Sequence, residues 1–189
     1  SREVKLLYYG LEAQPMLRVT LSNKELFNCQ QAANFRSMLA RASGVTNQRK
    51  DPTRTDQELD LVGIKGELAV SKAYNTDFNV FEFGVDAGAD MFIGDVALDV
   101  KTTKYVTGTL LFKSVESFKS PIAVLCVEID ANTMGIAGWI NRKDFAAKCC
   151  EFINPKIKNK TGSVCVNQDQ LQSPESLWLK TTELRLANG

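Results

Sequence analysis

The chain has 189 residues, a length that suits one well-buried domain rather than two. Apolar residues make up 44% of it, charged residues 24%, and the formal net charge is +1, so it lacks the basic excess of a protein that coats nucleic acid. There is no histidine, which excludes Ser-His-Asp and Cys-His catalysis, histidine-ligated zinc and a histidine general base. A hydrolase built from this chain is left with carboxylates, lysine and a metal ion.

The cysteines predict a reducing compartment. They are odd in number and none stands in a C-x-x-C spacing: Cys29, Cys126, Cys149, Cys150 and Cys165. This pattern favours free thiols over a zinc or redox site, and hence the cytoplasm. No apolar run approaches the roughly 18 residues of a membrane span, and no signal peptide is visible, so no membrane partner is expected. Neither a P-loop nor a G-x-G-x-x-G pattern is present, so no nucleotide cofactor is predicted.

Residues 1–54 are predicted to form an extension made of a β-hairpin, a helix and a loop. The two hairpin strands are Val4–Tyr9 and Met16–Leu21. Ser22 and Glu25 match the capping-box pattern, in which each side chain accepts a hydrogen bond from the other residue's backbone. A helix should therefore run from here to about Arg41 and end at a glycine. Residues 44–55 are polar and basic and are predicted to be a loop.

A second helix is predicted from Thr55 or Asp56 to about Tyr74. One of its faces consists mostly of small residues and contains Gly63 and Gly66. Mid-helix glycines cost about 1 kcal/mol each relative to alanine, so we expect this face to approach a strand very closely. The opposite face carries an apolar strip, formed by Leu61, Ile64 and Leu68. This strip fits packing of the first helix or of a second copy of the chain.

Short apolar segments downstream predict a sheet. The predicted strands are Phe78–Phe83, Asp90–Ile93, Val96–Thr103, Leu110–Phe112, Pro121–Ile129, Ile136–Ile140 and Ser163–Val166. The second and third of these form a hairpin around Gly94 and Asp95. The nearly continuous apolar run from Pro121 is typical of a strand covered on both faces.

These elements predict one α/β domain, in which a mixed central sheet of about four or five strands is flanked by helices. Residues 55–150 form its core and include an Asn141-capped helix over Arg142–Cys150. Residues 151–189 form a tail that packs on this core. Three apolar side chains of the tail are expected to pack against this core: Leu171, Leu177 and Trp178.

The two strands of the predicted hairpin contain candidate catalytic residues. Side chains alternate between the two faces of a strand. Three apolar side chains therefore point to one face, as a core requires: Val96, Leu98 and Val100. Asp99 and Lys101 point together to the other face. Asp90 lies on the partner strand at the same end of the hairpin, so two carboxylates and a lysine are expected to converge.

Glu67 supplies a third carboxylate. It lies at the border of the small-residue face of the second helix, from which it can point along the sheet edge toward Asp90 and Asp99. With the backbone carbonyl of Val100, these oxygens suit Mg²⁺, or Mn²⁺ as a substitute. Such a metal lowers the pKa of a bound water, and Lys101 can orient the hydroxide and stabilise phosphate oxygens. This set of residues suits phosphodiester hydrolysis.

Other acidic residues compete for these roles. Asp86 and Asp95 are alternatives to Asp90, although Asp95 fits a turn residue and Asp86 fits a cap of the neighbouring glycine-containing loop. Glu58 is the alternative to Glu67, but it falls on the opposite border of the helix.

Polar and basic residues near the predicted site are candidate DNA contacts. Thr102 and Lys104 continue the active strand, and a basic loop before the second helix contains Arg49, Lys50 and Arg54. Further candidate DNA contacts are Arg36 on the first helix and three lysines of the tail, at 156, 158 and 160. Each fits either a phosphate contact or an ordinary solvated side chain.

Asp90, followed after eight residues by the sequence DVK at 99–101, resembles the PD-(D/E)xK nuclease signature, with Ala89 where that pattern often has proline. The sequence GIKGELA at 63–69 is similar to the glutamate-bearing first helix of the same superfamily. This superfamily includes Holliday-junction resolvases, restriction endonucleases and recombination exonucleases. The wider layout, up to the sequence GWI at 138–140, also resembles small phage and bacterial proteins assigned to it.

The resemblance covers about residues 63–140 and implies a restriction-endonuclease-like fold. It also implies that Glu67, Asp90 and Asp99 bind metal and that Lys101 is catalytic. We therefore expect a Mg²⁺-dependent deoxyribonuclease, an endonuclease rather than an exonuclease, with DNA as its partner. A homodimer is also expected, because cutting both strands needs two sites. The alternatives are a non-catalytic DNA- or protein-binding module that keeps the nuclease fold, and a structural assembly component.

Overall fold

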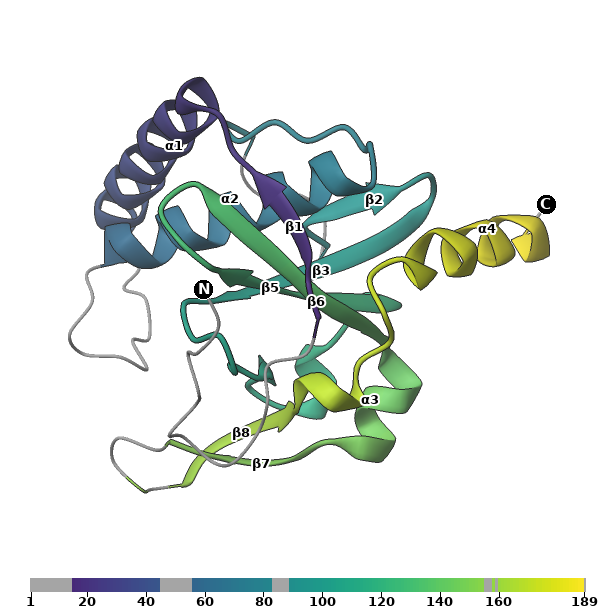
Figure 1. Cartoon of the computed structure of the whole chain (residues 1–189). Helices are drawn as coiled ribbons and strands as arrows, with labels where there is room; N and C mark the ends of the chain where they lie inside the picture. The colour runs from purple at the N-terminus through teal and green to yellow at the C-terminus, as the bar shows by residue number, and fades with distance from the viewer. Residues whose placement is uncertain (1–14, 45–55, 83–88, 155–157, 159, 189) are drawn as a thin grey trace.

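The computed structural model describes residues 15–44, 56–82, 89–154, 158 and 160–188 (Figure 1). Within these residues the fold is α/β, with a five-stranded central sheet and a smaller three-stranded sheet. The central sheet has the order β1-β6-β5-β3-β2, and the smaller one the order β4-β8-β7. The central sheet is mixed, because β3 and β5 are parallel whereas its other neighbouring pairs are antiparallel.

The elements have the following bounds. The central sheet consists of β1 (Leu17–Thr20), β2 (Met91–Ile93), β3 (Val96–Thr103), β5 (Ile122–Glu128) and β6 (Thr133–Asn141). The smaller sheet consists of β4 (Leu110–Phe112), β7 (Cys150–Ile153) and β8 (Lys160–Val166). The α-helices are α1 (Asn23–Ala42), α2 (Asp56–Ala73), α3 (Arg142–Lys148) and α4 (Ser176–Asn188), and short 3₁₀ turns lie at Val115–Ser117 and Gln168–Gln170.

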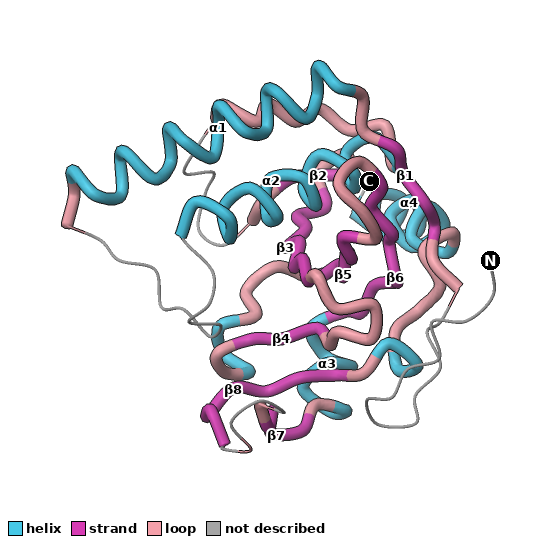
Figure 2. Tube along the Cα trace, turned by 60° about the vertical axis from the view of Figure 1, so that its left-hand side comes forward, coloured by secondary structure: helices cyan, strands magenta, loops and turns pink. Residues whose placement is uncertain are grey.

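Helix α2 lies between α1 and one face of the central sheet, and the smaller sheet and α3 cover the opposite face (Figure 2). Successive side chains of β5 point to opposite faces of the central sheet. Val124 packs in the apolar cluster under α2, and Leu125 packs in the apolar cluster next to the smaller sheet. Ile64 of α2 packs with Cys29 and Ala32 of α1. The apolar strip of α2 is therefore covered by α1, and it is not a surface for a second copy of the chain.

The ends of the first helix follow from its capping residues. Both hydrogen bonds of the predicted capping box are present, with Ser22 Oγ accepting from the Glu25 N–H at 3.2 Å and Glu25 Oε2 accepting from the Ser22 N–H at 3.4 Å. After Ser43, the C-cap, Gly44 adopts a φ of +69°, which glycine tolerates without a Cβ clash. The sequence prediction for this helix is confirmed.

Helix α2 approaches β3 closely at Gly66, one of the two glycines from which close packing was predicted. A Cβ atom placed on Gly66 would lie 1.9 Å from Oγ1 and 2.9 Å from Cβ of Thr102. Gly63, one turn earlier, has nothing within 4 Å of the same position. Gly66 alone therefore permits the contact, and this contact fixes where Glu67 leaves the helix.

Several predictions of local structure are wrong or incomplete. Residues Phe78–Glu82 form no strand, because Asn79 Oδ1 accepts from the Phe81 N–H and closes a turn instead. β1 pairs with β6 and belongs to the central sheet rather than to an appendage, while Val4–Tyr9 lies outside the described residues. The tail contains β7 and α4, neither of which was predicted.

The three apolar residues of the tail pack on the core as expected. Leu177 is fully buried, and Leu171 packs against the cluster beside the smaller sheet. Trp178 meets the buried Tyr74 edge-on, with ring centroids 5.9 Å apart, while the residue stays 41% exposed.

Candidate active site

The candidate site lies beside the first residue of β2, at the point where β3 continues beyond its pairing with β2. β2 pairs with β3 only over Val96–Leu98, so the later residues of β3 lack a β-strand neighbour on that side among the described residues. Asp90 takes the place of a neighbouring strand here. Its backbone N–H donates to the Leu98 carbonyl at 2.8 Å, and its Oδ2 accepts from the Val100 N–H at 2.7 Å. The carboxylate of Asp90 is thus fixed beside the middle of β3.

Asp99 and Lys101 project from β3 on the face that looks toward the smaller sheet. Nζ of Lys101 lies 3.0 Å from Oδ1 of Asp99 and 4.8 Å from the ring centroid of Phe112 in β4. Asp99 is buried, whereas the lysine side chain remains 39% exposed. The ammonium is therefore held between a carboxylate and an aromatic face and still reaches solvent.

Glu67 reaches the same edge of the sheet from α2, on the other face. Its side chain is 12% exposed, and its Oε2 lies 3.5 Å from Arg36 of α1. α1 thus contributes a cation to the site. The packing of α1 on α2, one of the two partners that the apolar strip of α2 allowed, brings Arg36 there.

Burial and the charges of neighbouring carboxylates raise the pKa values of Glu67 and Asp90. Burial and then the charge of Asp90 raise the pKa of Glu67 to about 7, although the nearby Arg36 guanidinium lowers it. Burial and then the charge of Asp99 raise the pKa of Asp90 to about 6, against the lowering effect of the Val100 N–H. Carboxylates that repel one another in this way are stabilised by an added cation.

The chemistry of these donors fits a hard divalent cation. Glu67, Asp90 and Asp99 offer carboxylate oxygens, which Mg²⁺ and Mn²⁺ prefer, although Oδ1 of Asp99 is already ion-paired with Lys101. Among the described residues, however, no group of three or more His, Cys, Asp or Glu residues is arranged so that it could hold a metal ion. Binding one ion by all three carboxylates would require their side chains to move closer together.

The other predicted site residues lie in different surroundings. Thr102 faces α2, where its hydroxyl is buried against Gly66, so its side chain is not on the face of Asp99 and Lys101. Val100 buries its side chain in the core and donates its N–H to Asp90. Lys104 is 41% exposed, and its Nζ lies 3.9 Å from Glu128. The predicted DNA contacts Arg49, Lys50 and Arg54 lie outside the described residues.

The competing acids are separated from the cluster in the part of the chain that can be described. Asp95 is exposed in the turn between β2 and β3, next to Gly94 with its φ of +64°. Glu58 is exposed two turns before Glu67, and Asp86 lies outside the described residues. Phe112 is the one partner of Lys101 that sequence reasoning missed, because the pairing of β4 with β8 that positions it joins distant segments.

No protein-family model, no curated protein and no solved structure matches this chain. None of the helices in the described ranges combines the length and apolar composition that crossing a bilayer requires.

Proposed function

We propose that the protein is a Mg²⁺-dependent deoxyribonuclease, an endonuclease of the restriction-endonuclease-like fold. The observation that supports this proposal is the ion pair of Asp99 with Lys101 on β3, together with the charge interactions of Asp99 with Asp90 before β2 and with Glu67 on α2. The absence of histidine leaves this cluster as the natural source of hydrolytic chemistry. The free cysteines support, within the same proposal, a reducing cytoplasmic compartment.

Each residue has a distinct role in the proposed reaction. Glu67, Asp90 and Asp99 would hold Mg²⁺, which when bound supplies a more acidic water and balances charge on the phosphate. Lys101, ion-paired with Asp99, would orient the attacking oxygen and neutralise the phosphate as negative charge builds up. Phe112 limits where the ammonium of Lys101 can move.

Cleavage of supercoiled plasmid and of branched DNA in Mg²⁺ or Mn²⁺ tests the proposal. Asp99→Ala and Lys101→Ala should each abolish cleavage. Asp95→Ala and Lys113→Ala are matched controls, because both side chains are exposed on neighbouring segments, and they should cleave like the wild type. Cleavage that survives both site substitutions would reject the assignment.

Metal binding is measured separately by thermal unfolding. A divalent ion that binds only the folded protein raises Tm by mass action, so Mg²⁺ or Mn²⁺ should stabilise the wild type and not Asp90→Asn. Absence of both cleavage and stabilisation would favour the alternative function, a non-catalytic DNA- or protein-binding module with this fold.

A further inference from the structure

Two cysteines that are distant in the sequence face each other in the smaller sheet. In the antiparallel pairing of β7 with β8, Cys150 lies directly opposite Cys165. Residues in such positions point to the same face of a sheet, with Cα atoms about 4.5–5.5 Å apart. A disulfide bond requires about 4.4–6.8 Å between Cα atoms, so the backbone already has the separation that a bond between these residues needs.

The two thiols are free, and they differ in their access to solvent. Cys150 is exposed, whereas Cys165 is only 4% exposed and its side chain is hydrogen-bonded to those of Cys150 and Thr109. Burial, and then the charge of Cys150, raise the pKa of Cys165 to about 11. A reagent in solution therefore meets the Cys150 thiol first, and the Cys165 thiol is placed to react next.

The remaining cysteines do not offer such a pair. Cys29 and Cys126 are fully buried, and burial raises their pKa values to about 11 and about 12. Cys149 ends α3, and its Sγ lies 3.8 Å from the Ala146 carbonyl oxygen, to which it donates. Only Cys150 and Cys165 combine an accessible thiol with a second thiol directly opposite it.

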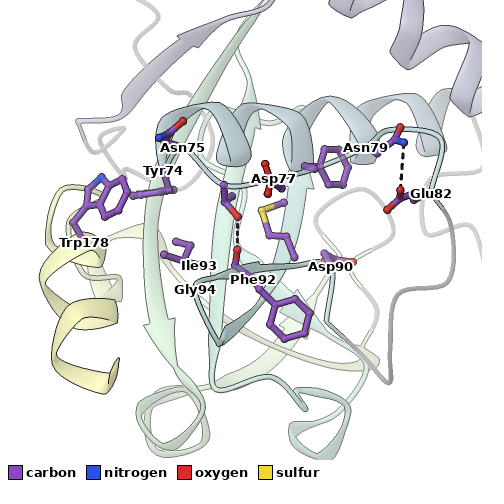
Figure 3. Close-up of a pocket in the computed structure, with 13 residues that line it drawn as sticks. Tyr74, Asn75, Asp77, Asn79, Glu82, Asp90, Phe92, Ile93, Gly94 and Trp178 are labelled. Atoms are coloured by element: carbon purple, nitrogen blue, oxygen red, sulfur yellow. Dashed lines mark hydrogen bonds between the residues drawn. The ribbon is translucent and has the colours of Figure 1, made fainter. Parts of the chain in front are cut away.

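This pair is separate from the pocket beside the candidate active site. That pocket, of about 850 Å³, lies between the segment that follows α2 and strand β2, and its described lining includes Asp90 and no cysteine (Figure 3). The smaller sheet, which contains the thiols, covers the opposite face of the central sheet from α2 (Figure 2). Chemistry at the thiols therefore takes place outside the pocket.

We propose that Cys150 and Cys165 are a modification site, at which hydrogen peroxide converts the two thiols to a reversible disulfide bond. The Cys150 thiolate attacks one peroxide oxygen, the O–O bond breaks, and the leaving hydroxide takes up the proton that the thiol lost and departs as water. The Cys150 sulfur has then given two electrons to the peroxide and is a sulfenic acid.

The second step forms the disulfide bond. The Cys165 sulfur attacks the Cys150 sulfur, the S–O bond of the sulfenic acid breaks, and the hydroxyl group leaves with the Cys165 proton as a second water. A dithiol reductant returns two electrons by thiol–disulfide exchange and restores both thiols. A bond that forms and is reduced in this way is compatible with a reducing compartment, where disulfides are transient.

The test treats the reduced protein with hydrogen peroxide, blocks the remaining thiols with iodoacetamide and measures the intact mass. The oxidised protein should be two hydrogen atoms lighter before blocking and should take up two fewer blocking groups. Proteolysis should release one peptide pair joined through Cys150 and Cys165, and dithiothreitol should separate it.

Substitutions assign the order of the two thiols. Cys165→Ala should stop the reaction at the sulfenic acid of Cys150, which dimedone traps, whereas Cys150→Ser should give neither the disulfide bond nor the dimedone adduct. Cys150 is exposed, so Cys150→Ser does not disturb the core. Cys149→Ser is the matched control, because it removes the adjacent thiol and should leave bond formation unchanged. Urea unfolding of each variant verifies that the fold is retained.

Thermal unfolding tests whether the sheet is preformed for the bond. A disulfide bond that fits the native backbone restricts the unfolded chain, and for a loop of this length in a protein of this size it should raise Tm by about 6–12 °C. An oxidised protein that is no more stable than the reduced protein would show that the bond distorts the pairing of β7 with β8, and would overturn the inference.

Three other results would overturn it as well. Peroxide could leave both thiols free, oxidise Cys150 to a sulfinic acid without forming the bond, or form a bond that is lost in Cys149→Ser. None of these measurements depends on whether the protein cleaves DNA, so the modification site and the proposed nuclease stand or fall separately.

Discussion

Replacing Gly66 by alanine should destabilise the protein relative to replacing Gly63 by alanine. Both glycines lie within α2, so each substitution gains the same helix propensity, about 1 kcal/mol. Only at position 66 does the new methyl group meet another atom, at 1.9 Å from Thr102 Oγ1. The difference between the two variants therefore isolates the cost of the steric clash.

The clash cannot be relieved by rotating Thr102. Its Cβ atom, which does not move when χ1 changes, lies 2.9 Å from the new methyl group, so α2 or β3 must shift. Overpacking of this kind costs about 1–3 kcal/mol. We therefore expect Gly63→Ala to be about 1 kcal/mol more stable than the wild type and Gly66→Ala to lie about 2 kcal/mol below Gly63→Ala.

Urea and thermal unfolding in a chelator measure this difference. For a chain of this size, 2 kcal/mol corresponds to about 4–8 °C in Tm. Adding Thr102→Ala to Gly66→Ala removes Oγ1 and Cγ2 but not Cβ, so it should recover part of the loss. Equal stabilities of the two single variants would refute the close approach of α2 to β3.

Two further predictions concern the buried charges. In the metal-free protein the pKa values of Glu67, about 7, and Asp90, about 6, lie above their unfolded values, so the folded state binds more protons and stability falls as pH rises from about 4 to 7. Glu67→Gln should remove about 3 kcal/mol of this dependence in urea titrations, and an unchanged slope would contradict it. Lys65, 5% exposed with its Nζ 2.9 Å from Glu128, joins α2 to β5, so Lys65→Met should cost about 3 kcal/mol of unfolding free energy. Adding Glu128→Gln should restore part of this, and a Lys65→Met variant as stable as the wild type would show that the pair is not buried in solution.

The elements that sequence predicts correctly are those with a local physical signal. The capping residues Ser22 and Gly44 define α1, and the alternation from Val96 to Thr103 separates the core face of β3 from the face of Asp99 and Lys101. Gly66 predicts the contact between helix and strand that places Glu67. The alternation along β3 and the close approach of α2 could therefore be inferred without coordinates, whereas a shared metal site of the three carboxylates stays a prediction.

What sequence misses depends on contacts between distant segments. β7 forms because its backbone pairs with that of β8, with Cys150 opposite Cys165 in the register, although the residues of β7 show no clear strand pattern. α4 has weak amphipathicity, so its helical state was not evident from periodicity. Arg36 meets Glu67 only because α1 packs across α2, and β-like residues at Phe78 form a turn because of Asn79.

The division of β3 between two faces also limits which changes of chain length the protein tolerates. Inserting or deleting one residue between Val96 and Asp99 would turn every later side chain to the opposite face, so that Leu98 or Val100 would take the position of Asp99 and a charged group would enter the apolar interior. An extra residue in the exposed turn at Gly94 and Asp95 would lengthen the loop and leave the side chains of β3 on their present faces. Related chains should accordingly vary in length at that turn while the eight positions that follow stay free of gaps.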